Sequence, residues 1–197
     1  MSDAVELEVG AVRAADAPAV LAFFAQNACG CHCRYWHFEG DKNAWLHRLA
    51  HEPEQNAGEL EHSLRSSDGT PQAVVARSPE GVVGWMKLSP AEAVQKLYAQ
   101  RIYKGLPCFD GDRGGVLTIG CFLVDEHWRR QGVARALLRA GVRIAQQSGA
   151  RAVEAFPRRG EHLGDPEMWL GPASLFEQEG FDVVNEFGPY PVLRRTF

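Results

Sequence analysis

One stretch near the middle of the chain limits the possible folds most. Residues 116–124 read VLTIGCFLV, an almost continuous apolar run that is typical of a strand covered on both faces. Over residues 132–147 apolar residues recur at steps of three and four, and Gly149 follows where a helix C-cap is expected. Residues 151–156, RAVEAF, predict a second strand. Such a strand–helix–strand unit should be parallel and right-handed, which predicts an α/β fold.

The other segments predict the remaining elements of that fold. A length of 197 residues suits a single domain spanning 1–197. Residues 72–77 and 82–88 are joined by Ser78-Pro79-Glu80-Gly81, which predicts a hairpin. Further strands are expected over 6–13, 181–187 and 192–197, and further helices over 17–27, 42–51, 54–65, 91–100 and 172–179. Asp16 stands at the N-cap position of the helix over 17–27, whose Phe23 and Phe24 are expected in the core.

Composition excludes several classes of partner. The net charge of −4 provides no overall basic field, so we expect neither nucleic acid nor an anionic membrane as a partner. No apolar run approaches the roughly 18 residues of a membrane-spanning helix, and MSDAVELEVG does not look like a secretory signal. We therefore predict a cytoplasmic protein. The five cysteines are then expected to be thiols rather than a disulfide framework.

The connection between the first parallel strand and its helix has the features of a phosphate site. The strand ends at Val124 and a short loop runs directly into the helix, whose first amides lack partners and carry a partial positive charge. Gly132 has no side chain and Ala134 only a methyl group. A diphosphate could therefore approach the main chain between Arg130 and Arg135.

Charge along this segment agrees with an anion site. Between His127 and Val153 there is no acidic residue but there are six arginines: Arg129, Arg130, Arg135, Arg139, Arg143 and Arg151. On charge alone, a solvated amphipathic helix explains these arginines equally well. The sequence contains no G-x-x-x-x-G-K-[ST], no G-x-G-x-x-G opening a helix after a strand, no H-E-x-x-H and no G-x-S-x-G.

A family resemblance rests on the same residues. Arg129-x-x-Gly132-x-Ala134 resembles the [RQ]-x-x-G-x-[GA] signature of the GNAT superfamily of N-acetyltransferases. The resemblance continues through the strand over 151–156 to residues 174–181, SLFEQEGF, which look like the family's helix ending in Gly-Phe. It implies the GNAT acyl-CoA N-acyltransferase fold, a mixed central sheet flanked by helices, whose two parallel strands splay apart.

The resemblance also implies acetyl-CoA as co-substrate; separately, the cysteine spacing leads us to expect no metal. The pantetheine arm would pair with the open strand edge at Phe122, Leu123 and Val124, where an amide would stabilise the oxyanion. The diphosphate would lie against the loop and first helical turn, formed by Arg129, Arg130, Gln131, Gly132, Val133, Ala134 and Arg135. The reaction implied is acetyl transfer to a primary amine by direct attack.

The acid and base are less well defined by the residues. Glu154 interrupts an apolar strand next to the expected splay and is the candidate base, although it could instead face solvent or pair with Arg151 or Arg158. Phe176 stands where many relatives have the Tyr that protonates the leaving thiolate, and Trp169 replaces their common Asn. These departures leave open a catalytically silent module that binds or senses acyl-CoA.

Residues 29–70 are expected to form a helical and aromatic insert that shapes the acceptor site. Within it, Cys31-His32-Cys33-Arg34-Tyr35-Trp36 resembles a bacterial subgroup of the superfamily with a C-x-C-x-Y-W segment. We predict that Cys31, Cys33, Tyr35, Trp36 and Trp169 contact the acceptor, a small-molecule or peptide amine. The three thiols of residues 29–33 lack a second ligand pair for zinc, so a thiol or metal module is the less favoured alternative. The resemblance also allows a homodimer.

Overall fold

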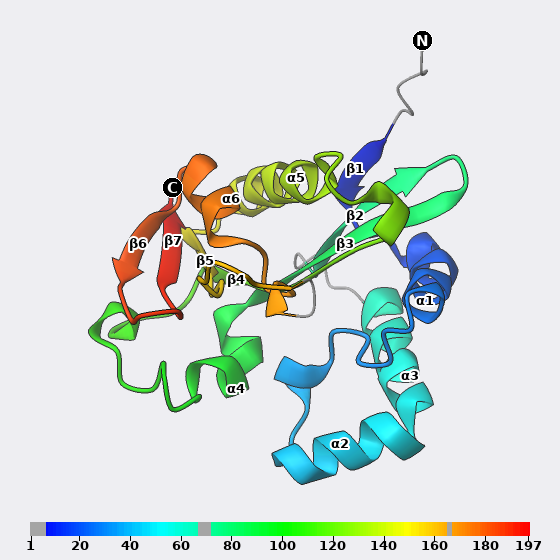
Figure 1. Ribbon diagram of the computed structural model, residues 1–197, viewed down its shortest axis with the longest axis horizontal. Helices are drawn as coiled ribbons and strands as arrows, with labels where there is room; N and C mark the ends of the chain where they lie inside the picture. Colours follow the sequence, from blue (N-terminus) through cyan, green and yellow to red (C-terminus); the bar gives the residue numbers. More distant parts are fainter. Residues whose placement is uncertain (1–6, 67–71, 165–166) are drawn as a thin grey trace.

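A mixed β-sheet forms the centre of the fold (Figure 1). The computed structural model describes residues 7–66, 72–164 and 167–197. Within these ranges seven strands form one sheet: β1 (Glu8–Ala11), β2 (Ala73–Ser78), β3 (Gly81–Pro90), β4 (Val116–Val124), β5 (Ala152–Ala155), β6 (Asp182–Asn185) and β7 (Val192–Thr196). Their order is β1-β2-β3-β4-β5-β7-β6, and only β4 and β5 are parallel neighbours. The predicted mixed sheet with two central parallel strands is confirmed.

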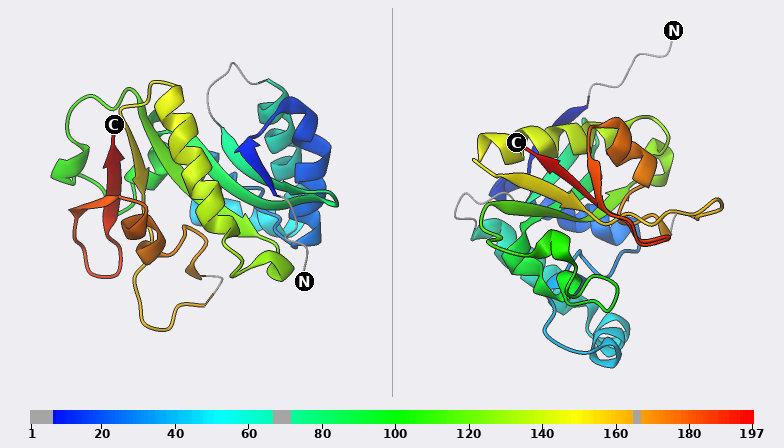
Figure 2. Two further views of the ribbon diagram at one scale, coloured as in Figure 1. Left: turned by 90° about the horizontal axis from the view of Figure 1, so that it is seen from above. Right: turned by 90° about the vertical axis from the view of Figure 1, so that its left-hand side faces the viewer.

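Helices cover both faces of this sheet. One face carries α5 (Val133–Gln147) and α6 (Ala173–Gln178), while the other carries α1 (Ala17–Gln26), α2 (Lys42–His51), α3 (Pro53–Arg65) and α4 (Gln95–Tyr98). Figure 2 shows α5 lying along the strands that it covers. Buried apolar side chains form one layer between the sheet and α5 and a second between the sheet, α1 and α3. Among the helices of the described ranges, none has the length and apolar character needed to cross a membrane.

Most predicted elements are confirmed with ends shifted by at most two residues. The helix predicted over 132–147 is α5, followed by Gly149 at φ +76°, a conformation that favours glycine. The exception is residues 91–100, where a 3-10 turn, Ala91–Val94, precedes α4. The two buried residues of this turn, Ala91 and Val94, are three positions apart, which matches the period of a 3-10 helix.

Gly141 lies where α5 packs closely on the sheet. A Cβ atom there would lie 2.2 Å from Met86 Cε on β3, so a larger residue would require the end of the Met86 side chain to move. The insert predicted over 29–70 contains α2, α3 and a 3-10 turn, Tyr35–His37, while residues 67–70 lie outside the described residues. Phe23 and Phe24 are buried in the α1 layer, as predicted.

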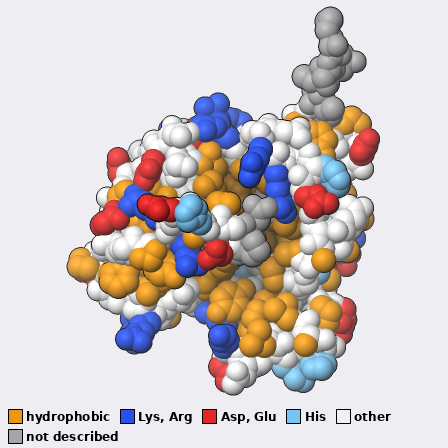
Figure 3. Space-filling view, viewed as in Figure 1, with side chains coloured by type: hydrophobic (Ala, Val, Ile, Leu, Met, Phe, Trp, Pro, Cys, Tyr) orange, Lys and Arg blue, Asp and Glu red, His pale blue; other side chains and the backbone are white. Residues whose placement is uncertain are grey.

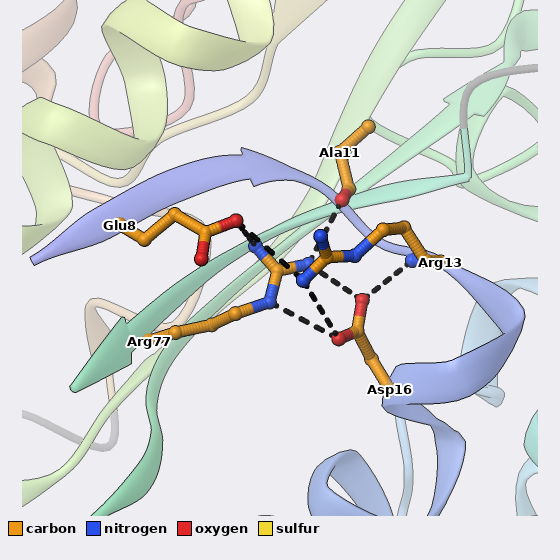
Figure 4. Close-up of polar contacts among 5 residues, drawn as sticks. All are labelled: Glu8, Ala11, Arg13, Asp16 and Arg77. Atoms are coloured by element: carbon orange, nitrogen blue, oxygen red, sulfur yellow. Dashed lines mark hydrogen bonds and ion pairs between the residues drawn. The ribbon is translucent and has the colours of Figure 1, made fainter. Parts of the chain in front are cut away.

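Asp16 is the N-cap residue of α1, as predicted, but its carboxylate makes no capping hydrogen bond to the helix, because it has other partners (Figure 4). Its Oδ1 accepts from Arg77 Nε at 3.1 Å, Oδ2 forms a 2.5 Å ion pair with Arg77 Nη2, and Oδ2 also accepts from the Arg13 amide at 2.6 Å. Despite the opposing effect of desolvation, hydrogen bonds from Arg77 and Arg13 lower the pKa of Asp16 below its usual value. The contact ties the start of α1 to β2.

Replacing Asp16 by asparagine should therefore lower the free energy of unfolding by about 2 kcal/mol at neutral pH, because a charged hydrogen-bond acceptor is lost. A carboxyl group with a lowered pKa in the folded state stabilises above its unfolded pKa, near 4, and loses that contribution as the pH falls further. The variant should show less acid sensitivity than the wild type below about pH 4. Urea unfolding between pH 7 and pH 2 measures both effects, with the exposed Glu80→Gln as control.

Candidate active site

The two parallel strands separate at their C-terminal ends. They pair only from Val116 opposite Ala152 to Thr118 opposite Glu154, whereas β4 continues to Val124. Residues 119–124 therefore lie beyond the parallel pairing and present an edge. Part of that edge is covered, since the Phe122 amide donates to the Trp169 carbonyl oxygen at 2.6 Å.

A cleft of about 1030 Å³ lies along this edge. Nine of the ten residues predicted for the cofactor line it; Gln131 does not, and its side chain donates to the His127 carbonyl at 2.6 Å. The opposite wall comes from a segment that sequence reasoning assigned no role apart from Trp169. It consists of Met168, Trp169, Gly171, Pro172, Ser174, Leu175 and Gln178. The Gly171-Pro172 pair before α6 is the only local signal that could have indicated this wall.

The loop between β4 and α5 has the backbone geometry of an anion cradle. Gly132, the N-cap of α5, has φ +84°, and Arg130 also lies in the left-handed region at φ +59°. These two left-handed residues, separated only by Gln131, bend the chain directly before the first amides of α5. The first intrahelical bond runs from the Ala136 amide to the Gly132 carbonyl, which leaves the amides of residues 133–135 without helical partners. These amides begin a helix that opens onto the cleft.

The arginines of this region are partly neutralised by acids from elsewhere in the chain. Arg135 and Arg139 pair with Glu179 at 2.7 and 2.8 Å, and Arg151 pairs with Asp112 at 3.1 Å. The two pairs with Glu179 hold α5 against the end of α6, whereas the pair with Asp112 links the residue before β5 to the loop before β4. Three of the six arginines are therefore paired with acids, and the main-chain amides are the stronger evidence for an anion site.

Glu154 lies at the centre of a buried ion-pair network. Its side chain is 0% exposed and contacts two guanidinium groups, Arg113 Nη2 at 2.6 Å and Arg194 Nη2 at 2.6 Å. Tyr98 donates its hydroxyl to Glu154 Oε2 at 2.7 Å, and burial, followed by the Glu154 charge, raises the pKa of that Tyr. The partners Arg151 and Arg158 considered from sequence are therefore wrong. Glu154 does not line the cleft, and its role as a base stays a prediction.

Phe176 occupies the position at which many relatives have the acid. Its side chain is fully buried, with ring centroids 6.0 Å from Phe122 and 5.4 Å from Phe181. It packs beneath the cleft as part of the core. The structure therefore gives Phe176 a packing role and no proton to donate.

The five residues predicted to contact the acceptor divide into two groups. Trp36 donates its indole N–H to the Gly120 carbonyl at 3.1 Å and stacks on Trp169 at 5.6 Å, beside the open edge of β4. The Tyr35 ring lies 4.6 Å from the Trp36 ring. Cys33 is buried in the α1 layer, while Cys31 lines a separate hollow. Figure 3 shows hydrophobic side chains gathered on the face that carries the segment between α1 and α2.

The described residues include no group of three His, Cys, Asp or Glu side chains placed to hold a metal ion. The lining of the cleft offers main-chain amides, arginine side chains and aromatic rings as recognition groups. Amides at a helix N-terminus suit a phosphate, and an open strand edge suits an extended amide chain. This combination matches the two chemical parts of acyl-coenzyme A.

Comparisons with known proteins agree with this site. No match was found among curated proteins. The N-acetyltransferase PaiA from Thermoplasma acidophilum, solved in complex with coenzyme A, superposes with a TM-score of 0.57 at 10% identity, covering 98% of this chain and 99% of that one. A GCN5-related N-acetyltransferase from Kribbella flavida gives 0.55 at 21% identity, covering 97% and 98%. A ribosomal-protein-alanine N-acetyltransferase from Brucella melitensis gives 0.53 at 18%, covering 96% and 99%.

These structural likenesses confirm the predicted fold. Membership of the subgroup with a C-x-C-x-Y-W segment stays a prediction. The sequence model of the acetyltransferase (GNAT) family matches residues 32–162, about two thirds of the chain, including the β4–α5 loop. The chain belongs to the GNAT family of acetyltransferases.

Proposed function

We propose that the protein transfers an acetyl group from acetyl-CoA to a primary amine by direct attack, without a covalent enzyme intermediate. The observation that carries this proposal is the cleft beside the splayed end of β4. One end of this cleft is formed by the left-handed Gly132 and the unpartnered first amides of α5. A diphosphate in this cradle accepts several hydrogen bonds from the main chain and faces the positive end of the helix dipole.

Strand alternation indicates which amides would receive the pantetheine arm. The Asp125 amide bonds to Val83 on β3, whereas the Phe122 amide points away from β3, toward Trp169. Successive strand amides point to opposite edges, so Val124 shares the open edge with Phe122. Pantetheine pairing at Phe122 requires the Trp169 carbonyl to move away from the Phe122 amide. Because the Trp169 ring stacks on Trp36, coenzyme binding should also change the contact between these two rings.

In the proposed reaction the amine nitrogen attacks the thioester carbonyl carbon and the C–S bond breaks. A main-chain amide at the open edge stabilises the oxyanion, and the coenzyme A thiolate leaves. The amine must first lose a proton, since a free alkylamine has a pKa near 10. We propose that Glu154 positions β5 through Arg113 and Arg194, because its carboxylate is already shared between two guanidinium groups. A water molecule that reaches the amine is then the simpler proton acceptor.

The acceptor would approach from the side of the stacked tryptophans. Trp36 and Trp169 form one apolar wall beside the open edge, and Trp169 is 37% exposed. Tyr35 lies next to Trp36. We propose that these three rings pack against the carbon skeleton of a small-molecule or peptide amine.

Release of coenzyme A thiol with a panel of primary amines tests this function. We expect turnover that requires both acetyl-CoA and amine, and that rises with pH because a larger fraction of the acceptor is unprotonated. Acetylated amine should form in equal amount to free thiol, as mass spectrometry can verify. A protein that binds coenzyme A but releases no thiol with any amine would instead be the silent module, which the buried Phe176 favours.

A further inference from the structure

Two half-buried thiols lie together in a surface hollow that is separate from the coenzyme cleft. The Sγ atoms of Cys29 and Cys31 are 3.5 Å apart. Both residues line a hollow of about 670 Å³, together with Phe24, Gly30, His32 and Pro53. No residue is shared between the lining of this hollow and that of the cleft. We propose that Cys29 and Cys31 form a reactive dithiol that a hydroperoxide converts to an intramolecular disulfide.

The backbone around the pair is strained. Ala28, His32 and Cys33 have φ values of 49°, 44° and 53°, and they are three of the four non-glycine residues with positive φ in the described ranges. Left-handed backbone is unfavourable for residues that carry a Cβ atom. Strain of this kind persists where surrounding contacts impose it, and it clusters at functional sites. Here it gathers in the six residues that carry the thiols.

Neighbouring contacts hold the strained turn in place. Asn56 donates its side-chain amide to the Gly30 carbonyl at 3.0 Å, and His32 Nδ1 lies 3.2 Å from the same oxygen. The His32 ring stacks on Phe24 at 5.1 Å. These contacts fix the turn on α1 and α3 and hold the two thiols close together.

The two thiols differ in chemical character. Hydrogen bonds from Cys29 and Cys33 lower the pKa of the Cys31 thiol, while the hydrogen bond to Cys31, together with burial, raises the pKa of Cys29. In the proposed reaction Cys31 is therefore the attacking thiol and Cys29 the thiol that completes the disulfide. Cys33 is buried, and burial raises its pKa, so it supports the thiolate without meeting solvent.

The reaction proceeds in two balanced steps. The Cys31 thiolate attacks one oxygen of the hydroperoxide, the O–O bond breaks, and the other oxygen leaves as water or an alcohol after taking one proton. Cys31 is then a sulfenic acid. The Cys29 sulfur attacks the Cys31 sulfur, the S–S bond forms, and the hydroxyl group leaves as water with the Cys29 proton. The two sulfurs need to approach by roughly 1.5 Å to reach the bond length of a disulfide.

Treatment of the native protein with hydrogen peroxide, followed by denaturation, labelling of the remaining thiols with N-ethylmaleimide and mass spectrometry, tests the proposal. The intact mass should fall by two hydrogen atoms. The tryptic peptide over residues 14–34 should carry a label on Cys33 alone, and Cys108 and Cys121 should stay labelled. Dithiothreitol should restore both thiols. Before oxidation, iodoacetamide at pH 6 should modify Cys31 at least about tenfold faster than Cys108.

Three variants separate the roles of the thiols. Cys31→Ser should prevent disulfide formation, and Cys29→Ser should stop at a sulfenic acid that dimedone traps. Cys108→Ser, a half-exposed thiol outside the hollow, is the matched control and should behave as the wild type. A crosslink from residues 14–34 to the Cys121 peptide, or peroxide consumption equal at Cys31 and Cys108, would overturn the proposal. The wild-type peptide map decides between these outcomes even if a variant fails to fold.

Discussion

Replacing Gly132 by valine should weaken coenzyme A binding by at least about 100-fold while the protein stays folded. A valine at φ +84° is strained by about 1 to 2 kcal/mol, and its branched side chain would stand beside the unpartnered amides of α5. Loss of two charge-assisted hydrogen bonds to a diphosphate accounts for a change of this size. Isothermal titration with coenzyme A measures the affinity.

Gly149 provides a matched control for this substitution. It has φ +76° at the other end of α5, and, as at Gly132, a Cβ atom there would meet no atom within 4 Å. Gly149→Val should therefore reduce stability by a similar amount and leave coenzyme A affinity unchanged. Equal affinity in the two variants would show that the loop before α5 does not hold the diphosphate.

Replacing Glu154 by glutamine should destabilise the protein by about 3 to 5 kcal/mol. The substitution leaves Arg113 and Arg194 in place around a neutral side chain, and removing one partner of a buried ion pair leaves the remaining charge buried without a partner.

The same variant tests whether Glu154 is the catalytic base. If Glu154 positions β5, kcat at saturating substrate should change little in the protein that remains folded; a fall of a hundredfold or more at unchanged fold would make it the base.

Glu179→Gln is the control variant for the loss of unfolding free energy expected at Glu154. Glu179 also binds two arginines, Arg135 and Arg139, but their side chains are 39% and 58% exposed. Water screens these pairs, so the destabilisation should be a fraction of that at Glu154. Urea unfolding of both variants at one pH measures the difference. Equal losses would indicate that burial does not set the strength of the Glu154 network.

Local pattern was sufficient to predict the strand–helix–strand unit and the cradle. The apolar run of β4, the helical period of α5 and the positions of Gly132 and Gly149 are all properties of neighbouring residues. The same is true of Phe23 and Phe24 on α1. These features depend on residues that are close together in the chain, so the sequence pattern is enough to predict them.

Contacts between distant residues could not be predicted in the same way. Glu154 pairs with arginines 40 and 41 residues away, and Glu179 neutralises two arginines of a segment that contains no acid. The hydrogen bond from the Phe122 amide to the Trp169 carbonyl joins strand β4 to an irregular segment 47 residues further along the chain. Each of these pairings depends on how β4, β5 and α6 are placed relative to one another in the folded protein. The periodicity of the sequence carries no information about that placement.

A crystal structure with coenzyme A bound tests the central claim most directly. We predict that the diphosphate oxygens lie within hydrogen-bond distance of the amides between Arg130 and Arg135, with the pantetheine arm along Phe122 and Val124 in place of the Trp169 carbonyl. Density for the nucleotide at any other surface, with the amides of that loop unoccupied, would contradict the account.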